Sequence, residues 1–464
     1  MKRRLGRSSL IAALLSLAAV SQVSVLPAAA TTKTTSAITA SELPAIPTGP
    51  TDDQEVSPSE SGAISREGGP ESCDSIERHF DTLAASGVTE VACTDPVTEE
   101  EAAQEVQEST KSPNAAAAPR TRCPASERGK GLIFGSRRYA CFETYFNMSV
   151  RDTRTRRVTG TAKFLFQQDW NLEKSDTTSK HPKFTEYFAV TLVKATGTAR
   201  KVNVKFTAEC PKCWVPGGGS TEISPVKGNL TQGKYLQADW SRWVDLSTKL
   251  RKSVGFRWSL QPVFPGVRTP PPYGWTHDPK IVPVRCDHEV GAYYGCVVPD
   301  MTPVLNLKYE TYKAAAMFVF VSQTLNKHHW GLRGKGKPLK RLADRVKQEE
   351  NRDIICDNTF QGDFHAPGPI SCDEFPFAAT RQSGATVGVQ SGKECEQMTT
   401  RKKANGDYDV YIVDDNADEN ALCTRATTPE DQNEAVGGAL GSFYQTARVL
   451  DKEAFYVHVY KDAR

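Results

Sequence analysis

The chain has 464 residues, which is too long for one ordinary domain, so we expect two or three domains. Its formal net charge is only +3, but acidic and basic residues are strongly segregated along the chain. After residue 30, no stretch is long and apolar enough to cross a bilayer, which excludes an ordinary membrane-spanning protein.

The first 30 residues are typical of a secretory signal peptide. Residues 2–7 carry four Lys and Arg, residues 10–20 form an apolar core, and residues 28–30 are alanines that suit a cleavage site. A membrane anchor is the alternative, but the apolar run is short for a membrane span. We therefore predict a secreted, extracellular protein.

Twelve cysteines agree with export, because an even number in an oxidising compartment suggests disulfides. The simplest prediction pairs neighbours along the sequence, although other pairings satisfy the count equally well. Cys210 and Cys213 form a CxxC motif, for which redox or zinc binding is the alternative. No second CxxC or His-x-His cluster accompanies it in the sequence, so we predict a structural role. The predicted pairs are Cys73–Cys93, Cys123–Cys141, Cys210–Cys213, Cys286–Cys296, Cys356–Cys372 and Cys395–Cys423.

The charges separate into acidic and basic regions. Residues 31–119 hold 4 Lys and Arg against 17 Asp and Glu, a balance of −13. Residues 120–310 hold 30 against 16, a balance of +14, and residues 331–464 hold 18 against 22, a balance of −4. A basic face suits a polyphosphate partner, although it also serves solubility or cell-wall binding.

Residues 31–119 are rich in Ser, Thr, Pro, Ala and acid, which predicts a mostly disordered segment. One ordered island is expected at 73–93, where Ile76, Phe80 and Leu83 recur at helical spacing. A solvated tether is the usual role of such a segment. The alternative is an acidic pro-segment that contacts the basic domain of the same chain and covers it.

Residues 120–310 predict a β-rich domain. Apolar residues alternate in 161–166, 188–192 and 202–206, which is the period of strands. Helical patterns are scarce, so an antiparallel, sandwich-like arrangement is expected. Its tryptophans and arginines would allow stacking on bases or sugars, but core packing is the commoner use of Trp.

The pattern changes after residue 311. Residues 338–349 predict a helix with Leu339, Leu342 and Val346 on one face, and residues 433–450 predict a second helix. Residues 409–413 and 455–459 predict strands.

Two short pieces of this region carry the clearest chemical pattern. In the first, the adjacent carboxylates Asp373 and Glu374 precede Phe375-Pro376. In the second, Asn433 opens the predicted helix and is followed at four-residue steps by Gly437 and Gly441. Carboxylates and an amide brought together in this way can build an oxygen-rich site for a hard cation. The alternative is an acidic surface turn and an ordinary helix cap.

In their order, spacing and terminal position, these pieces resemble the secreted NucA/NucB deoxyribonuclease family. The Asn351-Arg352 pair and the closing strand at 455–459 extend the resemblance, which covers residues 326–464. It implies a small α+β nuclease domain of the ββα-metal type that lacks the usual histidine base. The whole chain is therefore expected to be multidomain, with segments at 1–30, 31–119, 120–310 and 326–464.

The resemblance also implies roles for single residues. Asp373 matches the position of the general base and would share in holding the metal, and Asn433 matches the amide that helps to hold it. Glu374 and Glu434 would assist as catalytic partners, either as direct ligands or through water. The implied cofactor is Mg²⁺ or Mn²⁺, because both prefer oxygen ligands.

DNA is the implied partner of this domain. Lys337 and Arg341 belong to a basic approach that precedes the site, and Arg352 lies in the matching Asn-Arg pair, so all three are expected to contact phosphates. Adjacent His328 and His329 would rarely aim at one point, so we place them at the surface or facing the substrate rather than on a metal.

The sequence departs from the compact members of the family. Sixty residues separate Asp373 from Asn433, and we expect a disulfide-pinned insertion there. Gln432 stands where the compact members carry an acid, and Gln382-Ser383-Gly384 replaces a common acid-Gly pair. Two functions therefore stay open: a secreted, metal-dependent endonuclease acting on extracellular DNA, and a non-catalytic binder of nucleic acid or cell wall.

Overall fold

The computed structural model describes residues 36–37, 44–50, 55–56, 72–95, 123, 130–218, 226–268, 273–276, 284–363, 368–413 and 420–463. All of them belong to one compact unit, residues 35–464. The predicted signal peptide and most of the predicted disordered segment lie outside the described residues. No helix among the described residues is long and apolar enough to span a membrane.

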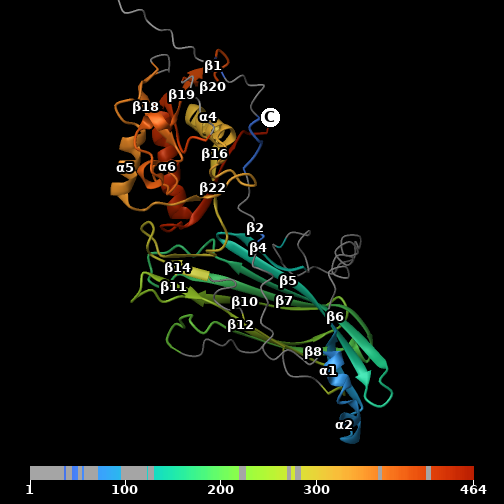
Figure 1. The fold of residues 1–464 in the computed structure, drawn as a ribbon. Coiled ribbons are helices and arrows are strands. Elements are labelled where there is room, and N and C mark those ends of the chain that lie inside the picture. The colour runs from blue at the N-terminus through green and yellow to red at the C-terminus, as the bar shows by residue number, and fades with distance from the viewer. Residues whose placement is uncertain are drawn as a thin grey trace, which may run out of the picture. The chain divides into compact units, whose positions relative to one another are not determined.

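Two antiparallel sheets form a β-sandwich lobe, which confirms the predicted β-rich region (Figure 1). The first sheet has the order β10-β7-β6-β5-β4-β2, with β3 also paired to β5, and the second has the order β13-β12-β8-β9. The strands of the first sheet are β2 (Glu55–Val56), β3 (Glu90–Asp95), β4 (Lys130–Ser136), β5 (Tyr139–Asp152), β6 (Val158–Asn171), β7 (Lys183–Gly197) and β10 (Tyr235–Trp243). Those of the second are β8 (Val202–Glu209), β9 (Val226–Leu230), β12 (Arg257–Val263) and β13 (Tyr273–Thr276), and a short helix, η2 (Thr198–Arg200), precedes β8.

The core of this lobe lies between the two sheets because each contributes one apolar face. In β8, for example, the buried and less buried residues alternate along the strand. Phe188 of β7 stacks on Phe206 of β8, and Phe166 of β6 stacks on Trp258 of β12 with ring centroids 3.9 Å apart. Trp258 is buried, so it is a core residue and is not available for stacking on a ligand. Burial of a large apolar side chain stabilises the fold by roughly 1.5–3 kcal/mol.

A small third sheet, β11 (Arg251–Val254), β14 (Val284–Asp287) and β15 (Gly295–Val297), joins this lobe. The disulfide Cys286–Cys296 links the facing strands β14 and β15. The loop between these two strands, residues 288–294, is therefore tethered at both ends.

The expected ordered island forms within the acidic segment. Helices α1 (Cys73–Glu77) and α2 (Phe80–Ala85) precede β3, and the disulfide Cys73–Cys93 closes the unit. The island attaches to the sandwich by the β3–β5 pairing and by ion pairs of Glu77 with Arg151 and Asp81 with Arg156. Part of the acidic segment thus contacts the basic domain, as the charge balance suggested.

In the described residues of the C-terminal lobe, two sheets combine with three α-helices and two short 3-10 helices (Figure 1). One sheet has the order β1-β20-β19-β21-β18 and the other the order β16-β22-β17. Helix α4 contacts strands of both sheets and helix α6, so it lies at the centre of a second core. The strands are β1 (Ser36–Ala37), β16 (Val304–Lys308), β17 (Leu339–Lys340), β18 (Ile370–Phe375), β19 (Glu396–Lys402), β20 (Tyr408–Ile412), β21 (Thr424–Pro429) and β22 (Ala454–Tyr460). The helices are α4 (Tyr309–Leu325), α5 (Arg345–Ile355), α6 (Glu430–Thr446) and the short η3 (Gly384–Val387) and η4 (Gly392–Glu394).

The predicted helix at 338–349 is wrong in its position. Leu339 and Lys340 instead form β17, which pairs with β22, and α5 begins only at Arg345. Asp344 caps this helix, because its side chain accepts hydrogen bonds from the backbone N–H of Val346 and Lys347. Leu339 is buried as expected, but Val346 is 63% exposed.

The other predicted elements of this lobe are found with shifted ends. The strand predicted at 409–413 is β20, and the strand predicted at 455–459 lies within β22. Helix α6 begins at Glu430, three residues before Asn433, because β21 runs directly into it. The lobe also starts earlier in the chain than the resemblance at 326–464, since β16 pairs with β22 and α4 fills the core.

A segment near the N-terminus crosses the C-terminal lobe. The backbone N–H of Gly49 donates to Lys461 O, and that of Lys461 donates to Pro47 O. Ile46 packs against the second core, and β1 pairs with β20. The acidic segment therefore contacts the C-terminal lobe as well as the sandwich.

All six predicted disulfides are present, and no described cysteine is free. The CxxC pair Cys210–Cys213 is itself a disulfide, so it has no free thiolates to offer a zinc ion. The Cys395–Cys423 disulfide closes the long interval between Asp373 and Asn433.

Candidate functional site

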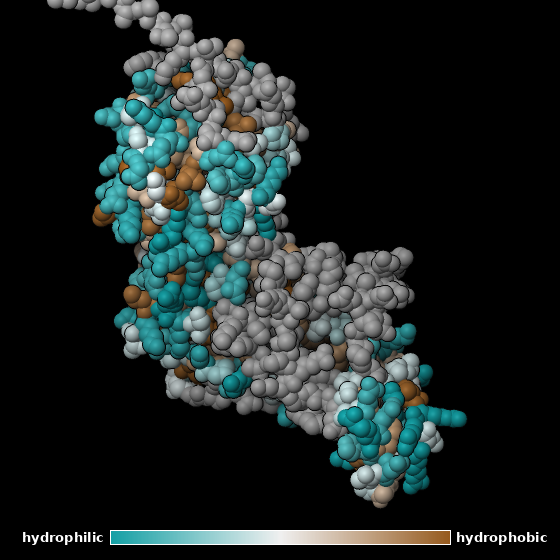
Figure 2. All heavy atoms as spheres, viewed as in Figure 1, coloured by the Kyte–Doolittle hydropathy of each residue, from teal (hydrophilic) through white to brown (hydrophobic). Residues whose placement is uncertain are grey.

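A groove of about 660 Å³ runs beside β18, α5 and α6 of the C-terminal lobe. It contains the pieces that the sequence singled out and, in addition, part of the sandwich lobe. In the view of Figure 2, the exposed side chains of the described residues are mostly hydrophilic, with small scattered hydrophobic groups. The residues that line the groove include Glu289, Gly291, Arg341, Arg345, Arg352, Asp373, Glu374, Asn433, Glu434, Tyr444 and Gln445.

Asp373 lies on β18 and is only 3% exposed, although it lines the groove. Its Oδ2 is buried and accepts no hydrogen bond from any residue that the structure describes. Burial raises the pKa of this carboxyl well above its usual range, and the neighbouring charge of Glu374 raises it further. An unpaired buried carboxylate is costly, so this atom is suited to a proton or a cation.

Glu374 is the second buried carboxylate, with 9% exposure. Its Oε1 accepts a hydrogen bond from the backbone N–H of Ala378 and lies 3.8 Å from Nε of Arg352. Burial raises the pKa of Glu374, and the nearby guanidinium of Arg352 opposes that rise. The two adjacent carboxyls therefore have different environments: one is supported by hydrogen bonds and a cation, the other has an unpaired oxygen.

Asn433 lies in the first turns of α6. Its Nδ2 donates to Ser371 Oγ at 3.0 Å and to the carbonyl oxygen of Cys372 at 3.1 Å. Its Oδ1 has no donor among the residues that the structure describes, and Asn433 lines the groove. The amide is therefore not the side-chain cap of this helix, whose N-terminal flanking residue is Pro429.

The predicted phosphate contacts divide into two groups. Arg341 and Arg352 line the groove, but Lys337 is exposed elsewhere and is not among the lining residues. Arg341 is committed to packing, since its Nη1 donates to Val449 O and its guanidinium lies 4.8 Å from the ring centre of Tyr444. Arg352 is 58% exposed and therefore free to meet a ligand.

Glu434 and the paired histidines also take different places. Glu434 is exposed at the edge of the groove. His328 stacks on Trp330, and Nδ1 of His329 contacts Gln323 O. Neither histidine lines the groove.

Two departures from the family pattern turn out to be supporting contacts. Gln432 faces α4 rather than the groove, because its Oε1 accepts a hydrogen bond from Ala314 N at 2.8 Å. Gly384 has φ +46, and a Cβ there would lie 2.6 Å from Asn351 Cα. Asn351 is fully buried and holds the turn after β18, since its Nδ2 donates to Ala378 O.

The C-terminal end of α6 is held by arginines of the sandwich lobe. Arg137 donates to Ala447 O at 2.9 Å, Arg138 to Thr446 O at 2.6 Å and Arg285 to Arg448 O at 2.6 Å. Cations at a helix C-terminus also interact favourably with the helix dipole. Burial lowers the pKa of Arg137 to about 10, which still leaves it charged at neutral pH.

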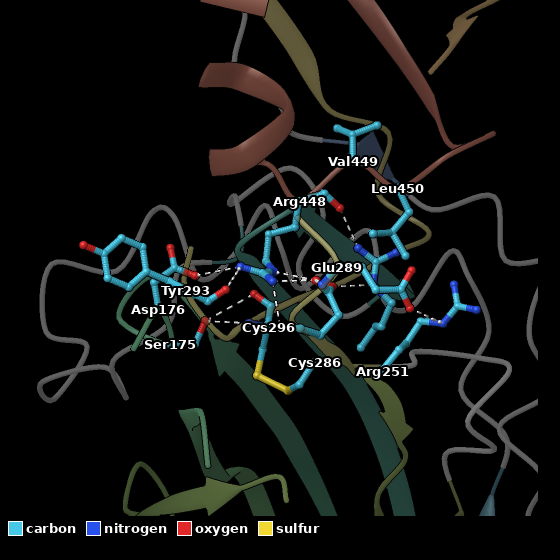
Figure 3. A network of polar contacts seen from close by, with 12 residues as sticks. Ser175, Asp176, Arg251, Cys286, Glu289, Tyr293, Cys296, Arg448, Val449 and Leu450 are labelled. Carbon is cyan, nitrogen blue, oxygen red and sulfur yellow. Dashed lines mark hydrogen bonds and ion pairs between the residues drawn. A yellow bond between two sulfur atoms is a disulfide. The ribbon is translucent and has the colours of Figure 1, made fainter. Parts of the chain in front are cut away.

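Arg448, just after the end of α6, makes the reverse contact from the C-terminal lobe to the sandwich lobe (Figure 3). We call this set of contacts between the end of α6 and the sandwich lobe the junction. Arg448 has φ +48, a conformation in which glycine is the usual residue after a helix. Its buried guanidinium donates to Asp287 Oδ1 and to the carbonyl oxygens of Asp287 and Tyr293. A left-handed backbone costs a non-glycine residue roughly 1–2 kcal/mol. The hydrogen bonds and the ion pair of the Arg448 side chain explain why an arginine occupies this position.

Sequence reasoning missed several groove residues. Arg345 and Gln348 share one face of α5 with the predicted Arg352, at spacings of three and four residues, and this signal was hidden because the helix was predicted too early. Glu289 and Gly291 come from the sandwich lobe, and no local pattern predicts that they reach this groove.

The groove offers oxygen atoms that fit a hard divalent cation. The orphaned Oδ2 of Asp373 and the unengaged Oδ1 of Asn433 are both ligand types that Mg²⁺ and Mn²⁺ accept, and Mg²⁺ is commonly held by one or two carboxylates plus water. The described residues contain one other cluster with metal-ligand atoms, Cys123, Cys141 and Asp169. Its two cysteines are joined in a disulfide, so it has no thiolate to offer.

Compared with known proteins, the sequence matches no protein-family model and no curated protein.

Proposed function

We propose that this protein is a secreted, metal-dependent endonuclease that hydrolyses phosphodiester bonds of extracellular DNA with little sequence preference. The observation that carries the proposal is the buried, unpaired Oδ2 of Asp373 in a groove lined by Arg345 and Arg352. A carboxylate able to take a proton beside cations able to hold phosphates is what phosphodiester hydrolysis needs.

The topology around the groove supports a C-terminal lobe of the ββα-metal type. Strand β18, which carries Asp373, is antiparallel to β21, and β21 leads directly into α6, which carries Asn433. The elements between β18 and β21 then correspond to the disulfide-pinned insertion. Two antiparallel strands followed by a helix thereby bring residues 60 positions apart to one groove.

Each residue has a role in this proposal. Asp373 acts as the general base that takes a proton from the attacking water, for which its buried, unpaired Oδ2 is available. Asn433 and Asp373 would hold the cation, and Arg345 and Arg352 orient phosphates. Glu374 and Glu434 support the site through water or as further ligands. Bound Mg²⁺ or Mn²⁺ would supply charge neutralisation at the phosphate and at the leaving oxygen.

The test is plasmid nicking by the full-length secreted protein with and without EDTA, together with Asp373→Asn. We expect EDTA to abolish nicking and Asp373→Asn to reduce it by about 10²–10⁴-fold, because proton transfer to a positioned base contributes that much. Asp431→Asn, at an exposed acid of α6 that does not line the groove, is the control and should keep its activity. Nicking that survives both EDTA and Asp373→Asn would refute the proposal.

A second function is favoured by the charge of the sandwich region. Residues 120–310 carry a balance of +14, which suits a non-catalytic binder of nucleic acid or cell-wall polyanions. Retained DNA binding without metal-dependent nicking in the experiment above would support this function instead.

A further inference from the structure

One wall of the groove belongs to the sandwich lobe, although the candidate catalytic residues all belong to the C-terminal lobe. Glu289 and Gly291, in the loop between β14 and β15, line the groove together with Gln445 of α6. Gly291 has φ +71, and a Cβ at this position would lie 3.2 Å from Gln445 Oε1. The loop therefore approaches α6 closely enough to limit the groove on this side.

The loop is held rigidly where it meets the groove. The disulfide Cys286–Cys296 ties the strands on either side of it, and Arg448 donates to Tyr293 O within it at 3.0 Å. Figure 3 shows the Arg448 side chain reaching toward this loop, with the disulfide on the far side. A wall that is fixed near both ends keeps its shape when a ligand enters.

The two sides of the groove differ in charge. On the α5 side, Arg345 and Arg352 are exposed and present positive charge. On the loop side, Glu289 forms an ion pair with Arg251, whose Nε lies 3.4 Å from Glu289 Oε1. The charges of Glu289 and Arg251 offset each other, so this pair has no net attraction for a phosphate.

We infer that the β14–β15 loop is a specificity-determining wall, in which Glu289 keeps phosphate groups away from the loop side and directs a nucleic-acid strand across Arg345 and Arg352. The inference rests on the proposed function, since it concerns the path of the same substrate. It assigns a role in substrate placement to the lobe that does not carry the candidate base.

Binding of a short, fluorescein-labelled single-stranded DNA, measured by anisotropy in EDTA, tests the wall without turnover. We expect Glu289→Lys to tighten binding by about 3- to 10-fold at low salt, and the gain to shrink between about 50 mM and 200 mM salt because it is electrostatic. Glu289→Gln should give a smaller gain in the same direction. Arg345→Glu should weaken binding.

Asp239→Lys is the matched control. Asp239 is an exposed acid on β10 of the same lobe and does not line the groove, so this change adds the same charge away from the wall. An equal gain for Asp239→Lys and Glu289→Lys would show a general charge effect and overturn the inference. So would unchanged binding in Glu289→Lys protein whose thermal unfolding is normal.

Nicking assays separate this inference from the proposed function. Metal-dependent nicking with no effect of Glu289 on binding would leave the endonuclease intact and remove the wall. If Glu289 variants bind DNA differently but the protein never nicks plasmid, the inference about the loop is supported and the proposed endonuclease function is refuted.

Discussion

Asn433 donates a hydrogen bond from Nδ2 to the carbonyl oxygen of Cys372, the residue directly before Asp373, at 3.1 Å. Helix α6 and strand β18 are thereby joined directly beside Asp373, the other candidate metal ligand. The contact fixes the orientation of the Asn433 amide, so its oxygen is the atom left for a ligand. The predictions below follow from this contact and from the elements that support it.

Replacement of Asn433 should reveal whether its amide binds metal or only joins two elements. We expect Asn433→Ala to lower nicking most strongly at low Mg²⁺ or Mn²⁺ and least at saturating metal, because a lost ligand weakens metal binding. Ser371→Ala removes one hydrogen-bond partner of Asn433 but no ligand oxygen, and serves as the control. Activity that falls equally at every metal concentration would indicate a structural role, typically worth about 1 kcal/mol.

The difference in stability between Asp373→Asn and the wild type should depend on pH. The raised pKa of Asp373 means that the folded wild type holds its proton more tightly than the unfolded chain, whose pKa is about 3.9. The stability from this group is complete below that pH and is lost as pH rises through the raised folded pKa. In EDTA, Asp373→Asn should therefore gain free energy of unfolding over the wild type as pH rises, as measured by urea denaturation. A constant difference from pH 4 to pH 8 would contradict this.

Arg352 should act on substrate binding rather than on the chemical step. It is more than half exposed in the groove, and it lies too far from Glu374 for a hydrogen bond, at 3.8 Å. We expect Arg352→Gln to raise KM for plasmid DNA several-fold, with a smaller change in kcat and little change in thermal stability. Lys337→Gln, outside the groove, should leave KM unchanged. Steady-state kinetics over a range of salt concentrations would check this, since the loss of a phosphate contact reduces the salt dependence.

The disulfide Cys356–Cys372 should matter for the site more than its position at the surface suggests. It joins the end of α5 to the residue before Asp373, so it couples the arginine helix to the candidate base. Replacing both cysteines with Ser should lower nicking as well as the melting temperature, because closing a loop of this length stabilises by about 3 kcal/mol. The Cys210–Cys213 pair in the sandwich lobe is the control, and its removal should leave the activity of the folded protein unchanged.

The buried junction at Arg448 should be essential for stability. Arg448→Gly relieves the positive φ but leaves Asp287, which is fully buried, without one of its two cationic partners. We expect the second effect to dominate and to cost about 3–5 kcal/mol, since breaking a buried ion pair leaves an uncompensated charge. Chemical denaturation of Arg448→Gly and Arg448→Lys would measure it. A more stable Arg448→Gly protein would show that backbone strain outweighs the junction.

Local sequence patterns determined much of the architecture. Alternating apolar residues such as Phe188 and Phe206 located the strands of the sandwich, because a strand that buries one face must alternate. Cysteine order gave all six disulfides, since each pair closes a short loop. The same local information failed at α5, where a pairing of Leu339 with β22 outweighed the helical spacing.

The candidate site was determined by sequence only in part. The order of Asp373, Glu374 and Asn433 along the chain indicated a cation site, but not that Asp373 is buried with an unpaired oxygen, because burial depends on segments distant in sequence. The tertiary structure alone decided that Glu289 and Arg448 bring the sandwich lobe to the same groove. Such contacts join residues more than a hundred positions apart. A local sequence pattern cannot predict them, because the two partners meet only when the chain has folded.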